Sequence, residues 1–166
     1  MSKKKAKTNA VRLLEQKKIT FDTREYEYSD KHAAALETAN ALGIDENQVF
    51  KTLVTVGNKT GPIVAVIPGN KTLDLKKLAK ASGNKKIEML PMKELEGLTG
   101  YIHGGCSPVG MKKLFPTYYA KEAEIFDTIH VSAGRRGLQM SVSPEDLLNV
   151  THGKYADLTE DETILG

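Results

Sequence analysis

Two apolar runs separated by a glycine-flanked turn constrain the fold of this 166-residue chain most strongly. Val49–Val56 and Pro62–Pro68 are rich in β-branched residues, and Gly57–Gly61, which reads Gly-Asn-Lys-Thr-Gly, joins them. β-branched side chains favour strands, and a short loop that contains glycine between two such runs is typical of a hairpin. The sequence therefore predicts an antiparallel hairpin over residues 49–68.

Helices and further strands are predicted on both sides of this hairpin. Apolar spacing and capping residues predict helices over Ala6–Lys17, His32–Leu42, Leu73–Ser82 and Pro91–Glu96, a capped turn after Asp45, and a last helix from Ser143. Further strands are expected at Phe21–Tyr28, Lys86–Met89, Thr117–Ala120, Ile129–Ser132 and Leu138–Val142. Three glycines and a proline make Thr99–Pro108 a loop.

The pattern contains no repeat or linker that would divide the chain. We therefore expect a single compact domain of the mixed α/β (α+β) class, with its core over about residues 10–157. Helices should surround a largely antiparallel or barrel-like sheet.

Composition and the N-terminal sequence indicate a cytoplasmic protein without a membrane partner. Hydrophobic residues make up 40% and charged residues 27%, as in ordinary globular domains. No apolar run approaches the roughly 18 residues of a membrane span, and residues 1–7 lack the apolar stretch of a secretory signal. The lone cysteine, Cys106, cannot form an internal disulfide, which fits a reducing compartment.

Charge is unevenly distributed although the net charge is only +3. Lysines open the chain, acidic residues close it, and basic pairs lie between, at Lys76-Lys77, Lys85-Lys86, Lys112-Lys113 and Arg135-Arg136. Such pairs are compatible with contacts to a phosphate backbone. Ordinary solvated surface charge explains any single pair as well.

The common catalytic signatures are missing from the sequence. It contains no phosphate-binding Walker loop, no dinucleotide fingerprint, no paired cysteines and no zinc-protease motif. The four histidines (His32, His103, His130 and His152) are scattered, so we expect neither a metal nor another cofactor. Cys106 with His103 would suit a thiol nucleophile and its base, but a cysteine between glycine and serine in a tight loop is more often a small residue that fits.

Three features stand out against this background. Lys51 interrupts the apolar run of the hairpin, either as a functional cation or as an edge lysine that discourages aggregation. The glycines of Gly104–Pro108 would let the backbone approach a ligand with its amide donors, or would simply form a tight turn. Val131–Leu138 places Ser132 at a strand end and two arginines at a hairpin tip, which ordinary turn chemistry also explains.

In their order and spacing, these segments resemble the YbaK/EbsC family. The resemblance rests on Val49–Leu53, Leu73–Ala79, Thr99–Pro108 and Val131–Leu138, and it covers nearly the whole chain. The family includes free-standing editing proteins related to the insertion domain of bacterial prolyl-tRNA synthetases. The resemblance implies a mixed α/β domain that binds an aminoacylated tRNA 3′ end and hydrolyses cysteine from tRNA(Pro).

The resemblance also implies site residues. Lys51 would be the main functional residue, holding a phosphate or hydroxyl of the terminal adenosine, with Gly104 near the aminoacyl group and Gly105 donating its N–H to the carbonyl oxygen. Residues implied in substrate binding are Tyr26, Thr52, Ser107, Ser132 and Gln139, and those implied in tRNA binding are Arg135 and Arg136. Gln139 departs from the family members that have aspartate there, and a neutral amide cannot serve as an acid or base.

The chemistry of editing explains why no catalytic nucleophile is required. A pocket separates near-isosteric amino acids such as cysteine and proline by only about 1–3 kcal/mol, so mischarged tRNA must be cleared at a second site. In the cysteine-specific members the substrate's own thiol attacks its carbonyl and gives a transient thiolactone. Expected partners are tRNA(Pro), with tRNA(Cys) and a transient complex with prolyl-tRNA synthetase as further candidates. The alternatives are an editing hydrolase for alanine or serine and a non-catalytic tRNA-binding module.

Overall fold

The computed structural model describes residues 7–28 and 35–161. Several sequence-based expectations lie outside this part of the chain: the basic N-terminal lysines Lys3–Lys5, His32 at the start of the second predicted helix, and Glu162 of the acidic C-terminus.

Five α-helices and eight strands make up the described fold, together with two 3-10 turns. The helices are α1 (Asn9–Gln16), α2 (Ala35–Leu42), α3 (Leu75–Ser82), α4 (Met92–Thr99) and α5 (Pro144–Thr151). The strands are β1 (Phe21–Glu25), β2 (Phe50–Gly57), β3 (Gly61–Pro68), β4 (Ile87–Met89), β5 (Thr117–Ala120), β6 (Ile129–Arg135), β7 (Leu138–Val142) and β8 (Lys154–Ala156). The 3-10 turns are η1 (Glu46–Gln48) and η2 (Lys121–Ile125).

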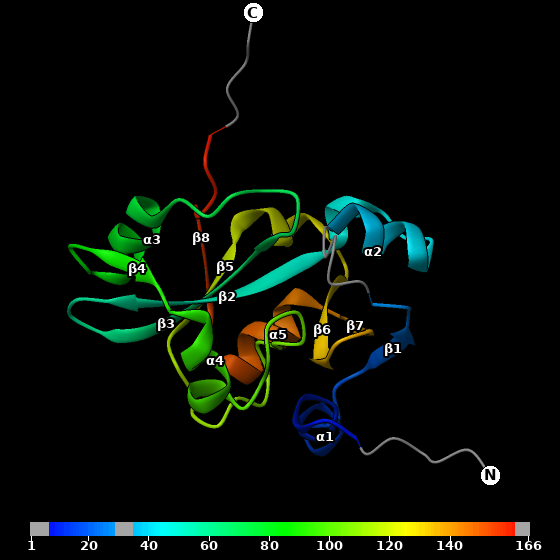
Figure 1. Cartoon of the computed structure of the whole chain (residues 1–166). Coiled ribbons are helices and arrows are strands. Elements are labelled where there is room, and N and C mark those ends of the chain that lie inside the picture. The colour runs from blue at the N-terminus through cyan, green and yellow to red at the C-terminus, as the bar shows by residue number, and fades with distance from the viewer. Residues whose placement is uncertain (1–6, 29–34, 162–166) are drawn as a thin grey trace, which may run out of the picture.

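The larger sheet has five strands in the order β4-β2-β3-β5-β8 (Figure 1). The hairpin predicted from the sequence is its centre, with antiparallel register from Phe50↔Pro68 to Gly57↔Gly61. β3 lies between β2 and β5 and is buried almost throughout, which explains its unbroken apolar sequence. β5 pairs in parallel with both β3 and β8, so the sheet is mixed.

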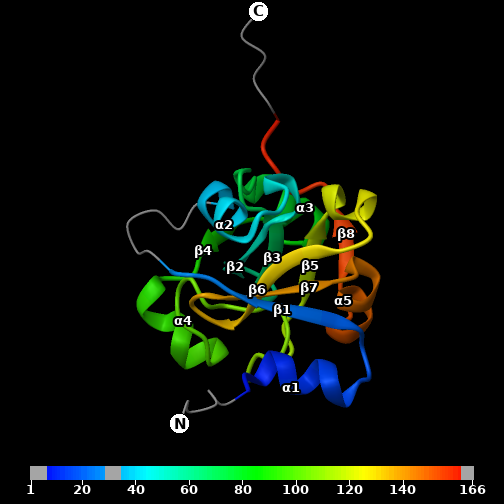
Figure 2. The same cartoon turned by 90° about the vertical axis from the view of Figure 1, so that its right-hand side faces the viewer.

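The smaller sheet is antiparallel and has the order β1-β7-β6. It faces the viewer in Figure 2, with α1 below it. An isolated parallel bridge between Val49 and His130 joins it to the start of β2. The two sheets therefore meet where β2 begins, beside β6.

Capping residues define where α1 and α3 begin and where α3 ends. The Asp74 side chain accepts the N–H groups of Lys76 and Lys77 at the start of α3, and Gly83 ends that helix at φ +75°, a left-handed conformation that glycine adopts without strain. Thr8 caps α1 and donates its hydroxyl to Ala133 O on β6, which ties α1 to the smaller sheet. α3 and α4 lie on opposite sides of the larger sheet in both views.

One hydrophobic core joins the two sheets. Its fully buried members come from both sheets and from the helices, and the largest are Tyr119, Leu14, Ile63, Ile67, Leu78, Ile129, Met140, Leu147 and Leu158. The predicted mixed α/β class is confirmed. The barrel-like alternative is not what forms, because among the described strands the two sheets remain open and separate.

The structure also extends and corrects several predicted elements. β6 continues past Ser132 to Arg135, so the turn that joins it to β7 is shorter than predicted. α4 runs to Thr99, and the cap predicted at Asp45 is confirmed. α3 begins at Leu75 rather than at Leu73, because Asp74 is its N-cap. Neither β8 nor η2 was predicted.

Candidate active site

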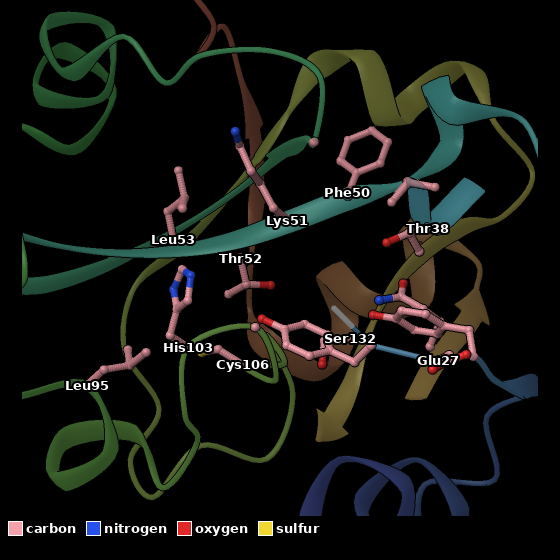
Figure 3. Close-up of a pocket in the computed structure, with 16 residues that line it drawn as sticks. Glu27, Thr38, Phe50, Lys51, Thr52, Leu53, Leu95, His103, Cys106 and Ser132 are labelled. Atoms are coloured by element: carbon pink, nitrogen blue, oxygen red, sulfur yellow. The ribbon is translucent and has the colours of Figure 1, made fainter. Parts of the chain in front are cut away.

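A cavity of about 170 Å³ lies where the two sheets meet. Its walls come from residues 26–28 after β1, from α2, the start of β2, α4, the glycine-rich loop, β6 and β7 (Figure 3). The lining residues are Tyr26, Glu27, Tyr28, Thr38, Val49, Phe50, Lys51, Thr52, Leu53, Gly69, Leu95, His103, Gly104, Cys106, Ser132 and Gln139. Six residues that the sequence singled out therefore line one cavity: Tyr26, Lys51, Thr52, Gly104, Ser132 and Gln139.

The smaller sheet turns a polar face towards this cavity. Gln139 on β7 is the cross-strand partner of Ser132 on β6 and of Arg24 on β1, and side chains at such paired positions share one face. Tyr26 follows Arg24 by two residues and is tied to the sheet by its N–H, which donates to Gly137 O at 2.9 Å. Gln139 is buried, Ser132 and Tyr26 are partly buried, and Arg24 is exposed. Polar side chains that are partly shielded from water around a cavity are typical of a binding site.

Lys51 brings a positive charge into this environment. β4 pairs with β2 only from Thr55 to Gly57, so no described strand pairs with the β3-distal edge of β2 at Lys51, which lines the cavity. Within the described part of the chain, the Lys51 ammonium group makes no hydrogen bond or ion pair. Partial burial lowers its pKa below the ordinary value, because desolvation disfavours the charged form.

Thr52 and Gln139 carry buried oxygens that lack a partner. Figure 3 shows Thr52 on the side of β2 that faces His103 and Cys106, while Lys51 and Leu53 project from the other side. Neither Thr52 Oγ1 nor Gln139 Oε1 has a hydrogen-bond partner among the described residues, and Gln139 is only 7% exposed. A buried polar group without a partner costs about 1–3 kcal/mol, so two of them at one cavity indicate that a ligand supplies the missing partners.

The glycine-rich loop approaches the cavity more closely than other residues would allow. Gly104 has φ +84°, and a Cβ placed on it would lie 2.4 Å from Tyr28 Oη. A Cβ on Gly105 would lie 2.9 Å from the backbone nitrogen of Arg136. The Gly104 N–H has no hydrogen-bond partner in the described structure and belongs to a residue that lines the cavity, so it is a candidate donor to a ligand.

Gly105 differs from the sequence-based expectation. Its N–H already donates to Ile102 O at 2.9 Å and closes a tight turn within the loop. This amide is therefore engaged and is not positioned to bind a substrate carbonyl. The donor role predicted for Gly105 is corrected, and Gly104 is the adjacent amide that remains available.

Cys106 lines the cavity but is poorly suited to act as a nucleophile. Its side chain is 7% exposed, and burial raises the pKa of the thiol to about 12, which keeps it protonated near neutral pH. No hydrogen bond joins it to His103 in the described structure. The described residues also contain no cluster of histidine, cysteine or carboxylate side chains that could hold a metal ion.

Comparison with known proteins shows the family of the chain. A family model described as the aminoacyl-tRNA editing domain matches residues 30–150, which is most of the chain. The chain belongs to the aminoacyl-tRNA editing domain family. It is 58% identical over 164 residues to EbsC of Enterococcus faecalis, a protein to which Cys-tRNA(Pro)/Cys-tRNA(Cys) deacylase activity is attributed, with 98% of this chain and 100% of EbsC covered.

Two further similar proteins have names that refer to prolyl-tRNA synthetase. A proline–tRNA ligase of Thermodesulfovibrio yellowstonii is 28% identical over 94 residues, which cover 57% of this chain and 16% of the ligase. A crystal structure described as that of a trans-editing enzyme for prolyl-tRNA synthetase superposes with a TM-score of 0.79 at 27% identity, over 95% of this chain and 100% of the other.

Besides Gly105, three residues that the sequence assigned to substrate or tRNA binding do not line the cavity. Ser107 is fully buried, and its hydroxyl accepts the N–H of Val109 at 3.2 Å, so it stabilises the loop rather than facing a ligand. Arg135 forms an ion pair with Glu25 at 2.9 Å. Arg136 donates Nε–H to His103 O at 2.9 Å and lies over the ring of Tyr28.

Sequence reasoning missed several lining residues of the editing domain. Tyr28 follows Tyr26 by two residues, so strand alternation alone would have placed both tyrosines on one face. His103 was considered only as a partner of Cys106. Thr38 and Leu95 come from α2 and α4, and no local pattern marks them, because their approach depends on how these helices pack around β2.

Proposed function

We propose that this editing domain acts as a free-standing deacylase that removes cysteine from mischarged tRNA(Pro) in the cytoplasm. The observation that carries the proposal is the combination of groups at the cavity. Lys51 is a partly buried cation without a partner in the described structure, while the thiol of Cys106, which lines the same cavity, stays protonated. Such a site can bind and orient a charged ester, but it has no evident side-chain nucleophile.

The size of the cavity supports a small acyl group as the enclosed part of the substrate. Its volume of about 170 Å³ is below the roughly 300–1,000 Å³ that encloses a drug-sized ligand. An amino acid fits such a space, whereas the rest of a tRNA must remain outside it. We therefore place the aminoacyl group inside and the terminal adenosine at the mouth, within reach of Lys51.

In the proposed reaction the nucleophile is the substrate's own thiolate. The sulfur attacks the carbonyl carbon of its own ester, and a C–S bond forms as the carbonyl π electrons move onto oxygen. Collapse of this adduct breaks the bond to the ribose oxygen, which takes up a proton, and the resulting thiolactone is then hydrolysed by water. An intramolecular attack of this kind needs mainly correct orientation, because the effective concentration of the nucleophile is already high.

The cavity residues take complementary roles in this reaction. Lys51 would hold a phosphate or hydroxyl of the terminal adenosine as a compact charge. The free N–H of Gly104 would stabilise the negative charge that develops on the carbonyl oxygen. The unpaired oxygens of Thr52 and Gln139 would accept hydrogen bonds from the α-amino group, with Tyr26 and Ser132 completing the polar wall.

The partners of this reaction follow from the same assignment. Aminoacylated tRNA(Pro) is the proposed substrate, and the name of EbsC supports charged tRNA(Cys) as a second one. We also propose a transient complex with prolyl-tRNA synthetase, since that enzyme produces the mischarged tRNA. The likeness to part of a proline–tRNA ligase supports this relationship.

Deacylation of a panel of charged tRNAs tests the proposal. Cysteine, serine and alanine esters of tRNA(Pro) are compared at equal enzyme concentration, and release of the amino acid is followed with time. Cys-tRNA(Pro) should be cleaved much faster than the others, with a rate that rises as pH approaches the thiol pKa of about 8.5, because only the thiolate attacks. Equal rates for cysteine and alanine would point to an attacking water and to alanine editing, and no cleavage at all would indicate a tRNA-binding module.

A further inference from the structure

Three segments that are distant in sequence meet at one edge of the cavity. These are Tyr28 after β1, the β6–β7 turn at Arg136, and the glycine-rich loop at His103–Gly105. Tyr28, His103 and Gly104 line the cavity, whereas Arg136 lies behind them. The arrangement raises the question of what holds the loop against the sheet.

Arg136 contacts both of the other segments. Its Nε–H donates to the backbone oxygen of His103 at 2.9 Å. Its guanidinium carbon lies 5.1 Å from the centre of the Tyr28 ring, within the range of a cation–π contact. The bond to His103 joins the loop of residues 102–108 to the β6–β7 turn.

The backbones on either side of these contacts are fitted closely. The Cβ that Gly104 lacks would lie 2.4 Å from Tyr28 Oη, and the one that Gly105 lacks would lie 2.9 Å from Arg136 N. The turn itself is fixed from the other side, because Tyr26 N–H donates to Gly137 O. The loop therefore rests on a rigid turn, and Arg136 is the side chain that fastens it there.

We propose that Arg136 and Tyr28 form a clasp that holds the glycine-rich loop closed, so that the Gly104 amide faces the reacting carbonyl. Arg136 is then a positioning residue for the deacylation proposed above rather than a contact to tRNA phosphate. This role rests on the proposed function, but the clasp itself does not.

The chemistry of the clasp requires arginine. A guanidinium group can stack its plane on an aromatic ring while its Nε–H points at a carbonyl oxygen. A lysine ammonium has no such plane and no fixed direction for its donors. A phosphate contact would tolerate lysine, so the conservative variant separates the two roles.

Cys106 provides a probe of the clasp that needs no substrate. It is the only cysteine of the chain, it lies two residues after Gly104, and it is buried. Its alkylation by iodoacetamide at pH 8 should therefore be slow in the wild-type protein. Opening the loop would expose the thiol and return its pKa from about 12 towards the ordinary range, which raises the thiolate fraction by up to about 10³-fold.

The first measurement compares alkylation rates of Arg136→Ala, Arg136→Lys and Tyr28→Leu with those of the wild type and of Arg135→Ala. Arg135→Ala is the matched control, because it removes the neighbouring charge from the same strand–turn region. We expect at least tenfold faster alkylation in the three clasp variants and no comparable change in the control. Thermal denaturation identifies any variant that is unfolded, and the alkylation rates of the folded clasp variants then test the proposal. Unchanged alkylation in folded clasp variants would overturn the clasp.

The second measurement separates positioning from RNA binding. With Cys-tRNA(Pro), loss of the clasp should lower kcat at least tenfold with little change in KM or in its salt dependence, and Arg136→Lys should not restore kcat. A raised KM, a weaker salt dependence and rescue by lysine would instead identify a phosphate contact and overturn the positioning role. If the wild type does not cleave this substrate, the proposed function fails, while the alkylation rates still decide whether the clasp exists.

Discussion

Replacing Lys51 by methionine tests the centre of the site, because it removes the charge and keeps most of the aliphatic stem. The packing of the side-chain methylenes against β2 is then nearly unchanged. In the described structure no acidic partner is left behind without its cation. The substitution should therefore separate a functional role of the ammonium group from a structural one.

The expected magnitudes follow from the environment of the ammonium group. A hydrogen bond to a charged group contributes about 1.5–3 kcal/mol, so its loss should lower kcat/KM about 10- to 150-fold if Lys51 binds the terminal adenosine. The free energy of unfolding of Lys51→Met should be higher than that of the wild type or unchanged. Because burial lowers the pKa of Lys51, the folded protein binds this proton less readily than the unfolded chain does.

The pH dependence gives the sign of this stability effect. Above the ordinary lysine pKa of 10.5 the group is neutral in both states, and burial carries no charge penalty. As pH falls through 10.5 and then through the lowered folded-state pKa, the penalty develops, and it is fully present at neutral pH. Lys51→Met should therefore be at least as stable as the wild type at pH 7, and the difference should narrow as pH approaches 10.5.

The assay combines steady-state deacylation of Cys-tRNA(Pro) with urea denaturation at pH 7 and pH 10. Lys51→Arg is the second variant, and it should not restore activity, because a planar fork does not replace a compact ammonium group in a narrow cavity. A Lys51→Met protein that keeps more than about half of the wild-type kcat/KM would refute the assignment. Marked destabilisation at pH 7 would show that Lys51 has a structural role.

Three further substitutions test other parts of the structure. Cys106→Ala should change deacylation less than about tenfold, because its thiol, with a pKa of about 12, is not the nucleophile; an acyl-enzyme trapped at Cys106 would contradict this. Gly104→Ala should lower kcat more than about tenfold and reduce Tm, because both its φ of +84° and the nearby Tyr28 hydroxyl oppose a side chain. Gly97→Ala is the control: this α4 glycine has open space around it, so the substitution should be neutral or stabilising. Asn84→Ala should lower the free energy of unfolding by about 2–3 kcal/mol, because Asn84 Oδ1 accepts the N–H groups of Lys59 and Thr60 in the hairpin loop. Denaturant titrations measure this change, with Asn149→Ala at an exposed position as the control.

Local signals account for the elements that the sequence predicted well. The β2–β3 hairpin follows from β-branched runs around a glycine-flanked turn, and α3 follows from a capping aspartate, Asp74, and a left-handed Gly83. β8 has no comparable signal. It is three residues long and exists because it pairs in parallel with β5, more than 30 positions earlier in the chain. Short strands of this kind depend on tertiary packing, which a local pattern does not contain.

The candidate site shows the same division between local and tertiary information. Glycine content predicts that the backbone approaches a ligand, but which amide stays free depends on the turn that Gly105 N–H closes with Ile102 O. The adjacent arginines at the β6–β7 turn suggested phosphate contacts. Their partners are Glu25, 110 positions away, and His103, 33 positions away, and neither pairing can be read from a basic dipeptide.

The polar face of the smaller sheet explains why alternation alone could not locate the cavity. β7 reads Leu-Gln-Met-Ser-Val, and a strand with one face in water would have the same pattern. Here the β6 and β7 part of that face is buried, since Gln139 is 7% and His130 is 6% exposed, although Arg24 on β1 stays exposed. Hydrogen bonds from Arg24 to Leu42 O and from Gln48 to Thr128 O join the segments around it. Burial and the nearby Arg24 charge lower the pKa of His130 on the same face, which favours its neutral form.

Buried polar groups that lack hydrogen-bond partners destabilise the fold. Gln139 Oε1 on the polar face of the smaller sheet and Thr52 Oγ1 on β2 are buried without partners among the described residues, and the neutral amide of Gln139 can accept a hydrogen bond but cannot transfer a proton. A site with an orienting cation, unpaired acceptors and no acid or base at this position suits a substrate that carries its own nucleophile. The absence of a carboxylate at Gln139 is therefore consistent with thiol-assisted cleavage, in which the protein has to orient the ester rather than activate a water molecule.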